Sequence, residues 1–203
     1  MARTAARKQK DGRFAKSPAT AKRPRVLVYG FGPYDDFRSN ITAKALAKLA
    51  GRKNLTKIVF PVRFDKSQFI RAVAKHNPDI VVGLGQCSRG ARFRIERGAV
   101  NRKRRRPSTK ATPIDAGGPR SLKTTLPLAA GREARWSEDA GSYVCNFSMY
   151  VLLDYIREKR LSTQFGFIHV PFSFSVRKAA NYVKTVLGRL EDSFSSSPAR
   201  RRC

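Results

Sequence analysis

The chain has 203 residues, of which 41% are hydrophobic, and this size and composition suit one domain with a buried core. The formal net charge is +29 at pH 7, and most of that charge remains when both termini are set aside. No apolar run reaches the roughly eighteen residues of a membrane-spanning helix, and three cysteines do not make a disulfide framework.

The two ends of the chain differ in composition from the middle. Residues 1–24 lack hydrophobic periodicity and are rich in Lys, Arg and Ala, which predicts a disordered basic tail; an organelle transit peptide remains an alternative. Residues 195–203 contain three consecutive arginines and are predicted to form a second disordered tail. The folded domain is therefore expected at residues 25–194. With no secretory signal pattern and few cysteines, we expect a cytoplasmic location.

Between the tails, apolar runs of strand length alternate with segments of helical periodicity. In chain order we expect strands at 26–30, 57–62, 80–85, 92–101 and 165–170, and helices at 41–49 (ending near Gly51), 66–75, 146–160 and 176–190. This alternation predicts an α/β fold, a three-layer sandwich whose largely parallel central sheet is flanked by helices. Sites in such folds form at the carboxyl ends of strands, where Gly30, Gly85 and His169 are expected.

Cys145 is the first candidate for chemistry, because it lies where a glycine-containing turn at Gly141 leads into a predicted helix. By composition alone a cysteine among apolar residues is more often a small buried side chain. At a helix start, however, the macrodipole would lower the pKa of the thiol, and nearby main-chain N–H groups could form an oxyanion hole.

His169 and Glu96 are the candidate partners of this thiol. His169 ends an apolar strand, whereas the only other histidine, His76, lies in a polar turn, so His169 is the better general base. Glu96 is the only acid between Arg89 and Lys110. It either orients the imidazole or forms a surface ion pair with a neighbouring arginine, and spacing alone does not decide between the two.

The stretch Arg89–Lys110 is the most basic part of the predicted domain, with ten Lys and Arg residues. Such a field attracts polyanions non-specifically and with strong salt dependence, but no nucleic-acid recognition motif accompanies it. A solvated basic face is the plainer interpretation. No His, Cys or carboxylate cluster has metal-ligand spacing, so neither a metal nor another cofactor is expected.

Five segments in order along residues 25–192 resemble the pyroglutamyl peptidase I family of cysteine peptidases. They are Val28–Tyr34, Gly83–Gln86 with Ile95–Asn101, Pro113–Asp115 through Thr125–Pro127, Ala140–Asn146, and Phe167–Pro171. The resemblance implies an α/β sandwich that removes an N-terminal pyroglutamyl residue from peptide substrates. It also implies roles for nine residues: Cys145 as nucleophile, His169 as base and then acid, Glu96 as the orienting carboxylate, and Phe31, Tyr34, Gln86, Tyr143, Val144 and Arg106 in substrate binding.

The chain also departs from the family pattern. Gly32 and Tyr34 replace the usual Glu and Phe, and a basic run replaces the segment with a substrate-site arginine, a position that Arg105 or Arg106 could fill. The stretch between Leu126 and Cys145 is shorter, and Leu128–Arg135 is too short for a full helix. Two alternatives therefore remain: a thiol amidohydrolase of altered acyl specificity, and an inactive homologue that binds nucleic acid. Whether the protein forms a homo-oligomer also remains open.

Overall fold

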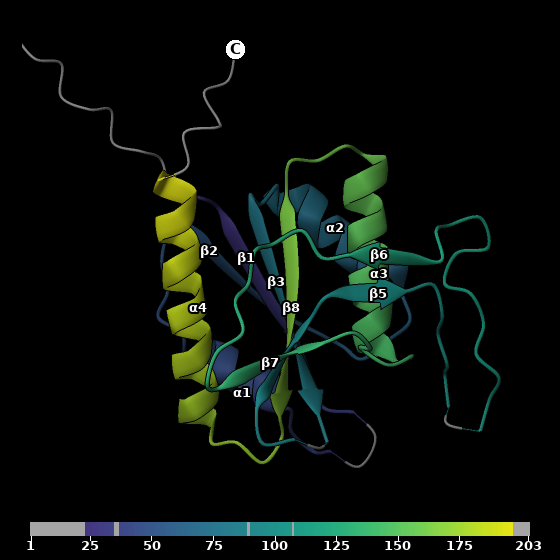
Figure 1. Cartoon of the computed structure of the whole chain (residues 1–203), viewed down its shortest axis with the longest axis horizontal. Helices are drawn as coiled ribbons and strands as arrows, with labels where there is room; N and C mark the ends of the chain where they lie inside the picture. Colours follow the sequence, from purple (N-terminus) through teal and green to yellow (C-terminus); the bar gives the residue numbers. More distant parts are fainter. Residues whose placement is uncertain (1–22, 35–36, 89, 107, 197–203) are drawn as a thin grey trace, which may run out of the picture.

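The computed structural model describes residues 23–34, 37–88, 90–106 and 108–196, and its centre is a six-stranded sheet in the order β2-β1-β3-β8-β4-β7 (Figure 1). The strands are β1 (Val26–Phe31), β2 (Leu55–Phe60), β3 (Ile80–Cys87), β4 (Phe93–Glu96), β5 (Gly98–Val100), β6 (Ser121–Lys123), β7 (Ala134–Ser137) and β8 (Gln164–Pro171). The helices are α1 (Ile41–Lys48), α2 (Lys66–His76), α3 (Val144–Glu158) and α4 (Val176–Ser196). Within the sheet only β4 and β8 pair antiparallel, so the prediction of a largely parallel sheet is confirmed.

Helices cover both faces of this sheet, which gives the predicted three layers (Figure 1). Helices α1 and α4 pack on one face, and α2 and α3 pack on the other. Neighbouring residues of β8 show the division: Ile168 packs in the α1–α4 core and Phe167 in the α2–α3 core. Because alternate side chains of a strand point to opposite faces, a strand between two cores is expected to be mostly apolar, and within β8 only Gln164 and His169 depart from this.

Local sequence explains where the helices begin and end. The side chain of Asn40 caps α1 by accepting a hydrogen bond from the Thr42 N–H, and Asp65 caps α2 in the same way through Ser67. Helix α2 ends at Asn77 in the left-handed conformation, which Asn tolerates better than most residues. Helix α1 ends at Lys48 and its C-cap is Leu49, so the predicted cap at Gly51 is wrong by two residues.

The single strand predicted at 92–101 is wrong, because the chain changes partners at Arg97. Strand β4 lies in the central sheet, whereas β5 pairs with β6 in a separate hairpin. The backbone of Arg97 bridges the two: its N–H donates to Ser137 and its carbonyl accepts from Thr124. The hairpin packs against α3, and the connection between its strands extends away from the sheet (Figure 1).

Two further predictions concern segment ends. Residues 128–135 hold no helix, as predicted, and β7 instead adds an edge strand beside β4. Helix α4 continues to Ser196, so the first two residues of the predicted C-terminal tail are helical. The rest of that tail, and residues 1–22 of the predicted N-terminal tail, lie outside the described residues.

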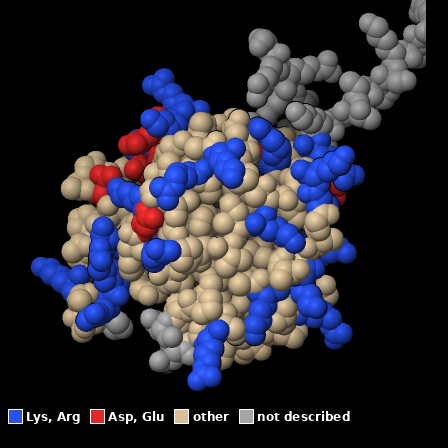
Figure 2. Space-filling model, turned by 180° about the vertical axis from the view of Figure 1, so that it is seen from behind, with Lys and Arg blue, Asp and Glu red and all other residues tan. Residues whose placement is uncertain are grey.

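Lys and Arg greatly outnumber Asp and Glu over the face shown in Figure 2. Within the described part of the chain, no helix is both long and apolar enough to cross a membrane. Within the same residues, no group of three His, Cys, Asp or Glu side chains is placed to hold a metal ion.

Candidate active site

A pocket of about 220 Å³ lies at the carboxyl ends of β1, β3 and β8, beside the first turn of α3. This is where ligands bind in open α/β sheets. The residues that line it are Phe31, Tyr34, Asn40, Val62, Gln86, Cys87, Ser88, Arg94, Ala140, Gly141, Ser142, Tyr143, Val144, Cys145 and His169. Seven of the nine predicted site residues are in this set, Glu96 contacts one of them from behind, and Arg106 is absent.

Cys145 is the second residue of α3, so its thiol lies at the positive end of the helix. Gly141, in the turn before the helix, has a φ of 85°, a backbone conformation that residues other than glycine adopt only with strain. The cap residue Tyr143 makes no side-chain cap hydrogen bond to the helix. Main-chain N–H groups of the first turn, which have no partner within a helix, therefore remain available to an anion in the pocket.

Gly85 makes room for the thiol and the imidazole. A Cβ atom at Gly85 would lie 2.8 Å from Cys145 Sγ and 2.8 Å from His169 Cδ2. The two reactive side chains therefore share the space above this glycine, and Cδ2 is bonded to the Nε2 atom of the ring. Any larger residue at position 85 would occupy the space between thiol and imidazole.

His169 is held by Glu96 on the neighbouring strand. Nδ1 of His169 lies 2.7 Å from Oε1 of Glu96, and both residues are buried. A carboxylate accepts only, so this contact places a proton on Nδ1 and leaves Nε2 as the basic nitrogen. Of the two interpretations of Glu96, orientation of the imidazole fits the geometry, because the side chain is fully buried and its Oε1 lies 2.7 Å from His169 but 3.9 Å from Nε of Arg94.

Burial raises the pKa of the Cys145 thiol to about 12, and electrostatic interactions with Glu96 and Cys87 add to this effect. Arg94 and the backbone N–H of Cys145 lower the pKa, but by less. The expectation of a lowered thiol pKa at the helix start is therefore wrong in this structure, because desolvation outweighs the favourable charges. The thiolate must form by transfer of its proton to a base within the site.

Aromatic side chains make one wall of the pocket. The rings of Tyr34 and Tyr143 are 6.4 Å apart, and Phe64 packs edge-on against Tyr143 at 5.4 Å. Gln86 fixes this wall, because its Oε1 accepts from the Ile41 N–H and its Nε2 lies 3.4 Å from the Tyr34 hydroxyl. This wall thus offers flat apolar surfaces, as suits an uncharged ring.

Arg106 lies away from this pocket. It is exposed on the connection between β5 and β6, where its backbone hydrogen bonds with Thr109. The pocket instead contains Arg94 of β4, which sequence reasoning did not single out. The signal was present, because Arg94 lies two residues before Glu96 on the same strand and therefore on the same face.

Asn146, beside the nucleophile, is another residue that sequence reasoning assigned no role. Its buried amide accepts from the Val100 N–H at 2.9 Å and donates to the carbonyls of Val100 and Arg102 at 2.9 and 2.8 Å. The Arg104 N–H also donates to the Ser142 carbonyl. These bonds join the turn that carries Cys145 to β5 and to the basic connection after it.

Comparison with known proteins places this site in a family. The family model described as pyroglutamyl peptidase matches residues 24–181, well over half of the chain. The chain belongs to the pyroglutamyl peptidase family. The match includes Glu96, Cys145 and His169.

Curated relatives are similar to this chain over most of its length. Pyrrolidone-carboxylate peptidase 1 of Ralstonia nicotianae is 34% identical over 169 residues, which cover 73% of this chain and 79% of the relative. A pyrrolidone-carboxylate peptidase of Clostridium botulinum is 36% identical over 169 residues, covering 73% and 78%.

Solved structures agree on the fold. A mutant pyrrolidone carboxyl peptidase from Pyrococcus furiosus superposes with a TM-score of 0.72 at 26% identity, covering 83% of this chain and 98% of the other. The pyrrolidone carboxyl peptidase of Thermococcus litoralis gives a TM-score of 0.75 at 23% identity, covering 84% and 94%. These structures support the three-layer α/β architecture for this pyroglutamyl peptidase family member.

Proposed function

We propose that this protein is a cysteine exopeptidase that removes an N-terminal pyroglutamyl residue from peptides. The observation that carries the proposal is a thiol, an imidazole and a buried carboxylate gathered at one pocket by Cys145, His169 and Glu96, in a member of the pyroglutamyl peptidase family. Its relatives carry the name pyrrolidone-carboxylate peptidase, which names this acyl group.

In the first half of the reaction, Sγ of Cys145 attacks the carbonyl carbon of the pyroglutamyl residue while Nε2 of His169 takes the thiol proton. The raised thiol pKa makes this concerted removal of the proton necessary, because little free thiolate exists beforehand. Glu96 accepts the Nδ1–H and stabilises the imidazolium that forms. Main-chain N–H groups at the start of α3 stabilise the oxyanion.

In the second half, the imidazolium of His169 gives its proton to the departing amine, and the peptide leaves without its first residue. Water then enters, His169 takes a proton from it, and the hydroxide attacks the thioester carbonyl. Release of pyroglutamate restores the thiol. No step requires a metal or other cofactor.

The walls of the pocket fit the acyl group. The lactam ring carries no charge, and the rings of Phe31, Tyr34 and Tyr143 together with Val144 give it flat apolar contacts. Gln86 holds this wall in place, because its amide accepts from the Ile41 N–H and donates to the Tyr34 hydroxyl. The volume of about 220 Å³ holds a ring of this size and part of the residue that follows it.

We assign the activity to the cytoplasm, because the reduced thiol that it needs persists in a reducing compartment. The +29 charge additionally favours weak, salt-sensitive contact with polyanions. Assembly into a homo-oligomer is a separate question that sedimentation of the purified protein answers.

The decisive experiment measures release of aminocoumarin from a pyroglutamyl-aminocoumarin amide under reducing conditions, with wild type beside Cys145→Ala. Turnover by the wild type that is lost in the variant supports both the reaction and the nucleophile. Absence of turnover by folded wild type, with cleavage of another N-acyl amide, would instead favour altered acyl specificity.

A further inference from the structure

A row of paired residues crosses the sheet beside the nucleophile. In the register of the strands, Gly85 of β3 pairs with His169 of β8, His169 with Arg94 of β4, and Arg94 with Arg135 of β7. Residues paired across strands point to the same face, with their Cβ atoms about 5 Å apart. The row therefore runs from Cys145, above Gly85, past the imidazole and Arg94 to Arg135 on the edge strand β7.

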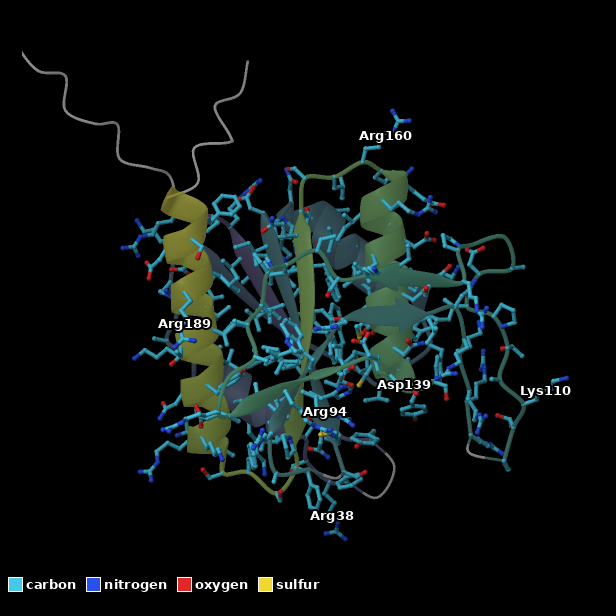
Figure 3. All side chains as sticks on the ribbon, viewed as in Figure 1. Arg38, Arg94, Lys110, Asp139, Arg160 and Arg189 are labelled. Carbon is cyan, nitrogen blue, oxygen red and sulfur yellow. The ribbon has the colours of Figure 1, made fainter. Side chains whose placement is uncertain are left out.

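Arg94 is poised to bind a ligand. It lines the pocket, and its Nε atom is shielded from solvent yet has no hydrogen-bond partner among the described residues. The nearest acid is Glu96, whose Oε1 lies 3.9 Å from this Nε, beyond hydrogen-bond distance, and is already paired with His169. In Figure 3 Arg94 lies at the lower end of the sheet, and Arg160 at the opposite end of the molecule.

The other side chain in the row, Arg135, is exposed and forms no ion pair with any acid in the described ranges. The nearby acids Glu138 and Asp139 pair with Arg97 and Arg102 instead. The outer end of the row therefore presents a positive charge to solvent that the protein does not neutralise.

The position of Arg94 relative to Cys145 and His169 determines which part of the substrate it contacts. The acyl group lies against the aromatic wall, and the departing amine must lie at His169, which protonates it. Arg94 is the next residue in the row beyond His169, so it lies on the side of the leaving group. The residue that follows the pyroglutamyl group therefore passes Arg94, and the chain after it runs towards Arg135.

We propose that Arg94, with Arg135 outside it, forms a subsite that binds a carboxylate on the leaving group, so that the enzyme prefers pyroglutamyl peptides whose second residue is acidic or carries the C-terminal carboxylate. This inference rests on the proposed function. A guanidinium with an unused buried N–H forms a strong charge-assisted hydrogen bond to a carboxylate and discriminates against the neutral amide.

The first test compares substrates that differ only in this carboxylate. We expect kcat/KM for pyroglutamyl-Glu-amide to exceed that for pyroglutamyl-Gln-amide by about tenfold, the effect of one charge-assisted contact. A second pair, pyroglutamyl-Ala with a free C-terminal carboxylate and the corresponding C-terminal amide, tests whether the bound carboxylate is that of the main chain. The pair with the larger ratio identifies the source, and equal rates within both pairs would overturn the proposal.

The second test changes the protein. Arg94→Gln should reduce the ratio of kcat/KM between the carboxylate substrate and its neutral partner to about twofold or less, and Arg94→Lys should retain part of that ratio. Arg135→Gln should reduce the ratio less, because that side chain is exposed. Arg189→Gln is the matched control: it removes one exposed arginine from α4, on the opposite face of the sheet (Figure 3). A drop in the ratio as large in Arg189→Gln as in Arg94→Gln would mean general attraction and contradict the subsite.

A third measurement needs no turnover and separates this inference from the proposed function. Iodoacetate and iodoacetamide alkylate the same thiol but differ in charge, so the ratio of their rates at Cys145 reports attraction of a carboxylate. We expect the rate with iodoacetate, relative to that with iodoacetamide, to fall about tenfold in Arg94→Gln. Mass spectrometry of the peptide that contains Cys145 measures both rates. An unchanged ratio refutes the subsite, whereas a changed ratio together with no peptidase activity in the folded wild type refutes the proposed function alone.

Discussion

Glu96 and His169 form a buried pair between the antiparallel strands β4 and β8, with Oε1 of the carboxylate 2.7 Å from Nδ1 of the imidazole. The second carboxylate oxygen, Oε2, is buried without a hydrogen-bond partner among the described residues. An unpaired buried oxygen is costly, so a structural role alone would favour a smaller or apolar residue here. The pair is better explained by its effect on the imidazole.

Replacement of Glu96 by Gln tests this explanation. The amide keeps the size of the side chain, but it cannot stabilise the imidazolium, and its NH₂ group would stabilise the wrong tautomer. We expect kcat on the pyroglutamyl-aminocoumarin amide to fall by about 10³-fold with little change in KM. Circular dichroism serves as the folding control, and a folded variant with more than a tenth of wild-type kcat would contradict the assignment.

The space above Gly85 gives a second prediction. In Gly85→Ala the new methyl group would lie within 2.8 Å of Cys145 Sγ, His169 Cδ2 and Phe167 Cε1, so at least one of them must move. Displacement of a reacting atom by about 1 Å costs on the order of 10²-fold in rate. The matched control is Gly51→Ala, where a Cβ meets no atom within 4 Å, and kinetic assay of both variants should show loss of activity only in Gly85→Ala.

The raised pKa of Cys145 gives a prediction of pH dependence. A raised thiol pKa means less thiolate at any given pH, so iodoacetamide should react more slowly with Cys145 than with free cysteine at pH 8. The rate should rise about tenfold per pH unit from pH 7 to 9 without levelling off, whereas free cysteine levels off near its ordinary pKa of about 8.5. A plateau near neutral pH would instead indicate a thiolate–imidazolium pair in the resting enzyme.

The long strands and helices and two of the catalytic candidates could be predicted from the sequence, because their signals are local. Apolar runs such as that of β3 and the periodicity of α3 determine the elements, and strand order in an α/β fold brings their carboxyl ends together. Cys145 and His169 each lie beside such an end, and so they could be expected to meet.

The parts that could not be predicted depend on contacts distant in sequence. Strand β7 is only four residues long, and its pairing with β4 is formed by residues about forty positions away. The break between β4 and β5 likewise depends on Ser137 and Thr124, which bond the backbone of Arg97. Arg94 was missed for the same reason: only the pairing of β4 with β8 brings it beside His169.

The last prediction concerns Asn146, whose amide holds the nucleophile turn against β5. Its three hydrogen bonds satisfy the Val100 N–H and the carbonyls of Val100 and Arg102, and the side chain is fully buried. Asn146→Ala would leave these groups without a partner, at a cost of about 2–3 kcal/mol in the free energy of unfolding. Asn146→Asp should also destabilise the fold, because a carboxylate oxygen would then face two carbonyl oxygens.

Urea denaturation measures this loss, and Gln68→Ala provides the control, because Gln68 makes one exposed hydrogen bond to the Arg63 carbonyl. That variant should change stability by less than about 0.5 kcal/mol. Since Asn146 follows Cys145 directly, Asn146→Ala should also lower kcat at temperatures where the protein remains folded. Full activity in a folded Asn146→Ala variant would mean that α3 alone positions the thiol, and that the contact with β5 contributes only to stability.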